Sequence, residues 1–163
     1  MSSTPDSWLR GVALGCVFAF FAGAADAACT DSRVDLRGKG GTVSFAVEIA
    51  DEPEERMRGL MFRESMPQFN GMLFLWEEPA ARSFWMRNTL LPLDIIFVDG
   101  RGVVQHVHEN AIPGDETGIP SRSNDITAVL EINAGLSELL GLAPGTELRH
   151  PAFAEDAAWP CPG

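Results

Sequence analysis

The sequence lacks most of the short motifs that indicate a particular chemistry. Its three cysteines include no Cys-x-x-Cys pair, which argues against a thioredoxin-like redox role. The chain has no Walker or dinucleotide-type glycine pattern, no internal repeat and no regular alternation of strands and helices. We therefore expect no cofactor, and less specific features have to indicate the function.

Positive charge is also scarce. The chain has 12 Lys and Arg residues against 23 Asp and Glu, a formal net charge of −11. A surface with this charge repels nucleic acid and anionic lipid, so we expect neither as a partner. An acidic exported protein can attract cations or basic partners, but solubility alone explains the charge equally well.

Residues 1–27 have the order of a secretory signal peptide. A polar segment with Arg10 precedes an apolar run, and Ala25-Asp26-Ala27 supplies the small residues of a cleavage site. We expect cleavage after Ala27 and a periplasmic or secreted protein without a stable membrane span. The alternative is an uncleaved anchor. Intact-mass measurement of the native protein decides between them, since a mass that includes residues 1–27 contradicts cleavage.

Removal of the signal takes Cys16 away and leaves Cys29 and Cys161 near opposite ends of the mature chain. An even pair of cysteines in an exported protein indicates a structural disulfide. We therefore predict a bridge between Cys29 and Cys161 that ties the two ends together. The alternative is two free or intermolecular cysteines.

The mature chain reads as one β-rich domain, 42–150, between a flexible lead-in, 28–41, and a Pro/Ala-rich tail, 151–163. Apolar residues alternate over 42–49, which predicts a half-buried strand. The stretch that follows predicts a short helix over about 52–61, with the preceding aspartate as its N-cap.

Short apolar runs and turn signals predict the other elements. An Asp-Gly pair joins 93–98 to 103–108 as a hairpin, and Asn133 and Gly141 begin and end a second short helix. Residues 110–125 form a long irregular loop. The predicted fold class is mainly β (α+β): a small antiparallel barrel or highly curved sheet with two short helices. Further strands are expected at 71–76, 83–86, 127–133 and in "APGTELRH".

Six stretches are more specific than these periodicities: "EIADEPEERMRGLMFRESMP", "GMLFLW", "RSFWMRNTLLPLDIIFVD", "HENAIP", "IPS" and "AVLEINAGLSELLGLAPGT". Together they resemble the bacterial and archaeal family known as domain of unknown function 192, over roughly residues 43–149. The resemblance implies a small, mostly β fold that is often exported, and it implies no activity, cofactor or catalytic residue. One departure is visible. "VVQHVHEN" is one residue longer than the family pattern before Glu109-Asn110, so we expect a bulge there.

The segment "SFWMRNTLLPLDIIFV", residues 83–98, is almost wholly apolar but contains Arg87, Asn88, Thr89 and Asp94. Buried charge is costly unless it is paired or hydrogen-bonded. In a structural interpretation, Asp94 accepts hydrogen bonds from backbone N–H groups, or from Asn88 or Thr89, and fixes the "NTLLP" turn. If 93–98 is a strand, one face carries Asp94, Ile96 and Val98 and the other carries Leu93, Ile95 and Phe97.

The alternative interpretation is functional. Trp85, Arg87, Asn88 and Asp94 line one wall of a cleft, in which N–H donors and an aromatic face hold an anionic or carbonyl-bearing ligand. Glu109, which matches the family pattern, is a further ligand-binding candidate. In this hypothesis, Asp94 is ionised and accepts hydrogen bonds from Asn88, Thr89 or their backbone. Asp94 then positions Arg87 and Trp85 toward the cleft.

We expect no metal site. Core packing explains the methionines of residues 57–86 better than copper binding does. His106 and His108 would point to the same side of a strand, but no third ligand is identifiable, which favours an exposed or edge face. A Ser–His–Asp arrangement using Ser121 or Ser123 lacks the nucleophile-elbow pattern.

These observations leave three hypotheses. The first is a noncatalytic binding module for a small ligand or a periplasmic partner protein. The second is a small hydrolase-like or isomerase-like enzyme that uses Asp94 and Arg87. The third is a cell-surface assembly component, which would expose a β edge that accepts a strand. The absence of an activated nucleophile and of a metal-ligand set favours the first, and the oligomeric state stays open.

Overall fold

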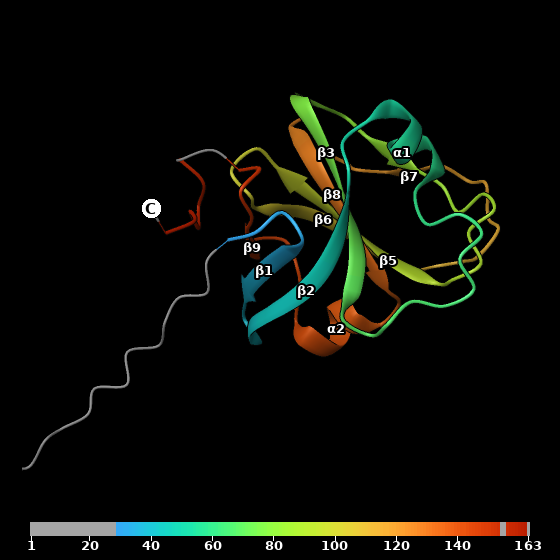
Figure 1. Cartoon of the computed structure of the whole chain (residues 1–163), viewed down its shortest axis with the longest axis horizontal. Helices are drawn as coiled ribbons and strands as arrows, with labels where there is room; N and C mark the ends of the chain where they lie inside the picture. The colour runs from blue at the N-terminus through green and yellow to red at the C-terminus, as the bar shows by residue number, and fades with distance from the viewer. Residues whose placement is uncertain (1–28, 154–155, 163) are drawn as a thin grey trace, which may run out of the picture.

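The computed structural model describes residues 29–153 and 156–162, which form nine strands and two short helices (Figure 1). The helices are α1 (Pro53–Arg58) and α2 (Leu136–Leu140). Within the described ranges, no helix has the length and apolar character needed to cross a membrane. The strands are β1 (Arg33–Gly38), β2 (Gly41–Ala50), β3 (Asn70–Ala80), β4 (Ser83–Phe84), β5 (Leu93–Asp99), β6 (Val104–Ala111), β7 (Ile119–Pro120), β8 (Ile126–Asn133) and β9 (Glu147–Arg149).

Seven strands form one strongly curled sheet in the order β6-β5-β8-β3-β2-β1-β9. Its two edges approach each other at one end, where the Val104 N–H donates to the Thr146 carbonyl (2.8 Å) and the Leu148 N–H donates to the Gly102 carbonyl (2.7 Å). The sheet is therefore a half-barrel, and the predicted mainly β fold with two short helices is confirmed. Strands β4 and β7 form a separate two-stranded sheet.

One strand pair departs from the antiparallel pattern. Strands β2 and β3 are parallel, which requires a long connection because a tight turn cannot join parallel strands. Residues 51–69 make this connection and contain α1. The Glu55 carboxylate accepts hydrogen bonds from the N–H groups of Asp51 (3.3 Å) and Glu52 (3.2 Å), so the N-cap is Glu52 rather than Asp51. The helix ends before the predicted position because Gly59 has a positive φ of 48°.

Apolar side chains form two cores on opposite faces of the sheet. The inner core fills the concave side with residues from the curled sheet and α2. The outer core lies on the other face of β3, β8 and β5, where segments around α1, β4 and β7 cover it (Figure 1). The predicted faces of β5 are confirmed: Ile96 and Val98 belong to the inner core, and Leu93, Ile95 and Phe97 belong to the outer core.

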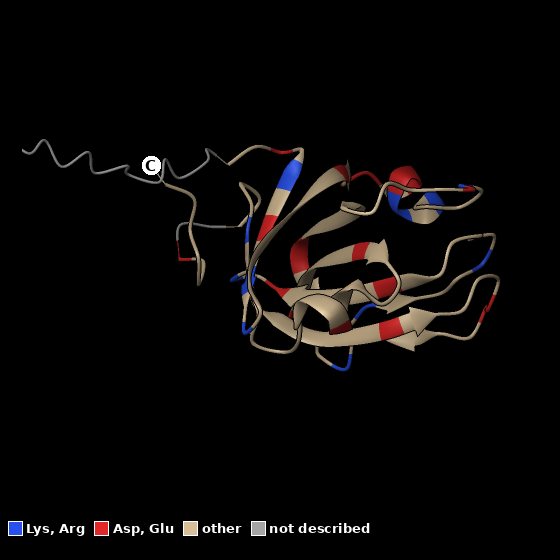
Figure 2. Ribbon diagram, turned by 90° about the horizontal axis from the view of Figure 1, so that it is seen from below, with Lys and Arg blue, Asp and Glu red and all other residues tan. Residues whose placement is uncertain are grey.

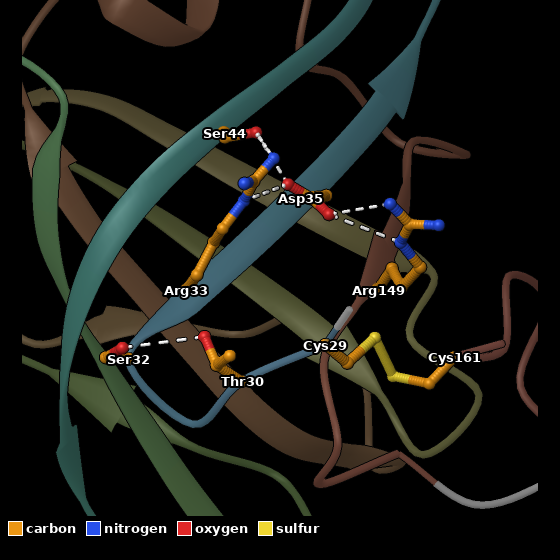
Figure 3. Close-up of polar contacts among 8 residues, drawn as sticks. All are labelled: Cys29, Thr30, Ser32, Arg33, Asp35, Ser44, Arg149 and Cys161. Atoms are coloured by element: carbon orange, nitrogen blue, oxygen red, sulfur yellow. Dashed lines mark hydrogen bonds and ion pairs between the residues drawn. A yellow bond between two sulfur atoms is a disulfide. The ribbon is translucent and has the colours of Figure 1, made fainter. Parts of the chain in front are cut away.

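The segment 28–41, which we expected to be a flexible lead-in, contains the regular strand β1. Its charged residues suggest a solvated loop, but the buried Asp35 carboxylate accepts hydrogen bonds from Arg33 (2.8 Å), Ser44 (2.6 Å) and Arg149 (2.9 Å) (Figure 3). Burial alone would raise the pKa of Asp35, but the hydrogen bonds from Ser44, Arg149 and Arg33 outweigh burial and lower that pKa. Internal pairing therefore lets a polar sequence form a buried strand.

The C-terminal tail returns to the same end of the sheet. The guanidinium groups of Arg37 and Arg149 lie 4.5 Å and 4.4 Å from the centroid of the Trp159 ring. Cys161 is bonded to Cys29, with 5.8 Å between their Cα atoms, as Figure 3 shows. The two ends of the described chain therefore lie together beside β1 and β9.

We expect the Cys29–Cys161 bridge to be present in solution and to stabilise the fold. It closes a separation of 132 residues, and chain entropy limits the contribution of such a bridge to about 5 kcal/mol, with smaller values common. Urea unfolding with and without a reducing agent measures this contribution. A Cys29→Ser/Cys161→Ser variant is the control, since its unfolding should not respond to the reducing agent. Nonreducing peptide mapping that finds no linked peptide would contradict the bridge.

Candidate functional site

Asp94 is the second residue of β5, on the inner face of the sheet, and is fully buried. Its Oδ1 accepts hydrogen bonds from the N–H groups of Asn110 (2.9 Å) and Gly135 (3.1 Å). Its Oδ2 accepts from the N–H (2.8 Å) and the hydroxyl (2.6 Å) of Ser137. The structural interpretation of Asp94 and its backbone N–H donors are therefore supported, but Asn88 and Thr89 are not among the donors. Residues 88–89 lie on the outer side of the sheet, whereas Asp94 points toward the start of α2.

A β-bulge directs one of these donors. The register between β5 and β6 shifts next to Glu109 and Asn110, and Asn110 has a positive φ of 55°. The bulge that the sequence predicts at this position is therefore confirmed. It turns the N–H of Asn110 out of the strand ladder and toward Asp94.

The other predicted ligand residues fall into two groups. Trp85, Arg87 and Asn88 lie together in one exposed turn, where the Arg87 guanidinium is 5.6 Å from the centroid of the Trp85 ring. Asp94 does not belong to this group, because it is buried on the inner face. Glu109 is exposed on β6 and makes no side-chain hydrogen bond or ion pair with a described residue.

A cavity of about 140 Å³ opens beside Trp85, between the connection that contains α1 and the segment 83–89. Aromatic contacts build one wall, since the Phe84 ring packs edge-on against Phe74 (5.0 Å between centroids) and Trp76 (6.2 Å). This wall of the cavity is therefore apolar. The aromatic and thioether lining of the cavity consists of Met57, Met61, Phe74, Trp76, Phe84 and Trp85.

Glu131 of β8 also lines this cavity, and it is not among the residues predicted from the sequence. It lies on the outer face between Met72 of β3 and Ile95 of β5, and it is 5% exposed. Its carboxyl group makes no hydrogen bond or ion pair with any residue of 29–153 or 156–162. In that part of the chain, every side-chain oxygen or nitrogen that is closed off from solvent has a hydrogen-bond partner. Because the Glu131 carboxyl has no such partner, its oxygens must keep a small exposed area, and this area faces the cavity.

The environment of Glu131 favours the uncharged carboxyl. Burial raises the pKa of Glu131 to about 8, and no nearby cation offsets this effect. Arg56, which lines the same cavity, donates instead to the backbone carbonyls of Asp51 and Leu75. Arg58 also lines the cavity but is exposed, on a helix that carries charges of both signs (Figure 2). At neutral pH the cavity thus ends in a carboxylic acid that can both donate and accept a hydrogen bond.

Three loops, 59–63, 85–90 and 112–115, are tied together beside the cavity. The Phe62 N–H donates to the Asn88 carbonyl (2.9 Å), and further backbone bonds join the second loop to the third. Phe62 and Asn88 both have a positive φ, which is unusual for residues other than glycine and is common at functional sites. These loops and α1 expose five large apolar side chains: Met57, Phe62, Trp85, Leu90 and Ile112.

The two histidines of β6 are half-buried on the outer face. The His106 ring stacks on Phe97 with 5.9 Å between centroids. Burial lowers the pKa of His106, and the charges of Arg122 and His108 lower it further. Among the residues with described positions, no three His, Cys, Asp or Glu side chains are grouped as metal ligands.

The serines considered for catalysis have structural roles. The Ser121 hydroxyl is buried, accepts a hydrogen bond from the Arg82 N–H (3.0 Å) and donates to the Ser123 carbonyl (2.8 Å). Neither serine hydrogen-bonds to a histidine or to Asp94 in the described ranges. The geometry thus gives no support to a Ser–His–Asp arrangement.

We expect Arg87→Ala to change the free energy of unfolding by less than about 1 kcal/mol. Arg87 is exposed, and among the described residues its side chain makes a cation–π contact with Trp85 but no hydrogen bond or ion pair, so its removal breaks no buried pair. Urea unfolding of the variant and the parent protein measures the change. If Arg87→Ala unfolds the domain, Arg87 is a structural partner and its assignment to a ligand site fails.

Comparisons with known proteins agree with the resemblance seen in the sequence. A model of the DUF192 family, described as an uncharacterized ACR, matches residues 34–150. A solved protein of unknown function from Novosphingobium aromaticivorans is similar, with 43% identity and a TM-score of 0.69 over 71% of this chain and 82% of that one. A protein from Sinorhizobium meliloti, described as a candidate transcription regulator, is 39% identical, with a TM-score of 0.72 over 77% of this chain and 98% of that one. No curated protein matches the chain.

Proposed function

This chain belongs to the DUF192 family, and from that premise we propose that it is an exported, noncatalytic binding module for a small organic ligand. The ligand site is the cavity between α1 and the segment 83–89. The observation that carries the proposal is the carboxyl group of Glu131, which is buried, unpartnered and in contact with this cavity. A nearly buried polar group without a partner from the protein is costly, so its retention at a cavity supports a role in recognition.

The lining of the cavity supports a ligand with an apolar body. Its walls carry four aromatic rings and two methionines, and the mouth is bordered by Met57 and Trp85, which are 72% and 45% exposed. Ligand sites are typically apolar cavities with a few polar groups that fix the orientation of the ligand. Of the ligand residues predicted from the sequence, Trp85 lines this cavity and the exposed Arg87 lies beside Trp85.

The geometry favours binding over the enzyme hypothesis that uses Asp94 and Arg87. Asp94 is fully buried and holds four hydrogen bonds from the backbone and from Ser137, so it has no free acceptor for a substrate. The net charge of −11 argues against nucleic acid as the ligand. This argument holds although one similar solved protein is described as a candidate transcription regulator.

The proposal is tested by screening small organic compounds against the full chain, with thermal stabilisation and tryptophan fluorescence as readouts. Trp76 and Trp85 line the cavity, so a bound compound should change their emission. Ser83→Trp should block binding, because Ser83 lines the cavity and a large side chain there occupies the mouth. Ser65→Trp, at an exposed position outside the cavity, is the matched control. Ligands that bind Ser83→Trp as well as the parent protein would contradict the assignment of the site.

A further inference from the structure

We infer that the ligand enters the cavity with an uncharged carbonyl group, preferably a primary carboxamide, that pairs with the carboxylic acid of Glu131. This inference rests on the proposed function. A neutral carboxyl group presents one O–H donor and one C=O acceptor side by side. A primary carboxamide presents the complementary pair, so two hydrogen bonds form at once and satisfy both atoms of the unpartnered group.

A cationic ligand is disfavoured by the charges that surround the cavity. Arg56 and Arg58 both line it. The faces of the two tryptophans, which would otherwise attract a cation, already carry guanidinium groups of the chain. Arg82 and Arg56 lie 4.4 Å and 5.5 Å from the centroid of the Trp76 ring, and Arg87 lies over Trp85.

An anionic ligand is disfavoured at the buried end. Among the residues that the structure describes, no cation pairs with Glu131, and its strand neighbours Met72 and Ile95 are apolar. His108 lies one strand further on the same face, in register with Ile95 and not with Glu131. An anion placed beside Glu131 would therefore be buried without a counter-charge, which is costly.

The size of the cavity sets the size of the buried group. An apolar cavity of roughly 150 Å³ holds a molecule the size of benzene, and the cavity beside Glu131 measures about 140 Å³ and opens to solvent. Benzamide fits this description with its amide group against Glu131 and its ring between the aromatic and methionine walls. Benzoate and benzamidine have nearly the same shape with a negative and a positive head group, so the three compounds separate charge from shape.

The test is calorimetric titration of the full chain with benzamide, benzoate and benzamidine at pH 6. We expect benzamide to bind at least about tenfold more tightly than either charged compound, since one unsatisfied buried hydrogen bond is worth about this factor. Glu131→Leu should weaken benzamide binding by about tenfold or more. Glu131→Gln keeps a donor and an acceptor and should retain the parent affinity within about threefold. Glu64→Leu, at an exposed position, is the control and should have no effect.

A pH series adds a second readout. Benzamide affinity of the parent protein should fall about tenfold per pH unit above a pH of about 8, where Glu131 ionises, while that of Glu131→Gln stays constant. Tightest binding of benzamidine or of benzoate, or no binding of benzamide, would overturn the inference. If Ser83→Trp blocks the binding of a screened compound and Glu131→Leu does not, the proposed function stands and the inference about Glu131 fails. Failure of every compound to respond to Ser83→Trp would overturn both.

Discussion

Replacement of Glu131 by glutamine is expected to stabilise the folded protein, and the gain should grow with pH. The pKa of this carboxyl is about 8 in the folded state and 4.5 in an unperturbed chain. Between these values the unfolded state has lost the proton and the folded state has kept it. Stability of the parent protein therefore decreases as pH rises through this window, because the unfolded state binds fewer protons. Glutamine does not titrate and removes this dependence.

The expected size of the effect is large for a single substitution. The difference between a pKa of about 8 and one of 4.5 corresponds to a loss of stability of at most about 5 kcal/mol above pH 8, and to almost none below pH 4.5. Urea unfolding of both proteins at several pH values between 4 and 9 measures it. Glu64→Gln makes the same chemical change at an exposed position and should stay within about 0.5 kcal/mol of the parent at every pH. A pH-independent difference between Glu131→Gln and the parent would mean that Glu131 has a partner when folded.

Replacement of Asp94 by asparagine is expected to destabilise the protein by about 3 kcal/mol. The carboxylate accepts four hydrogen bonds, of which three come from backbone N–H groups that cannot reverse their direction. In either orientation the asparagine NH₂ group faces at least one of these donors inside the core. The variant thus loses hydrogen bonds to a charged group and leaves a buried N–H unsatisfied.

Urea unfolding with an unchanged m-value measures this loss. Ser137→Ala is the matched comparison. It removes only the hydroxyl bond (2.6 Å) to Asp94 and should cost about 1 kcal/mol. Under conditions where Asp94→Asn is folded, its affinity for benzamide should equal that of the parent protein, because Asp94 lies on the opposite face from the cavity. A loss of less than about 0.5 kcal/mol would show that Asp94 does not hold α2 in place.

Local patterns predicted the parts of the fold that depend on neighbouring residues. The alternation in 93–98 predicted which side of β5 each residue faces, and an extra residue predicted the bulge before Asn110. The donors to Asp94 were not predictable in this way. Gly135 and Ser137 are more than 40 positions away along the chain, at separations of 41 and 43 residues, and only the sheet order brings them to the start of β5.

Two other features were hidden for different reasons. Strand β1 reads as a polar lead-in because two of the three partners of Asp35, Ser44 and Arg149, come from β2 and β9. Glu131 reads as an ordinary polar residue of a half-exposed strand, because the sequence does not reveal that the connection between β2 and β3 covers that face. A lone acidic residue between Leu130 and Ile132 was the available signal, but it acquires meaning only once the covering segments are placed.

The position of the disulfide determines how the molecule responds to mechanical tension. Cys29 and Cys161 flank every strand of the sheet, with 5.8 Å between their Cα atoms. A pulling force applied on the N-terminal side of Cys29 and the C-terminal side of Cys161 passes through the S–S bond, so the load bypasses the hydrogen bonds of β1 and β9. While the bridge is intact, tension on the two ends of the chain cannot unzip the half-barrel.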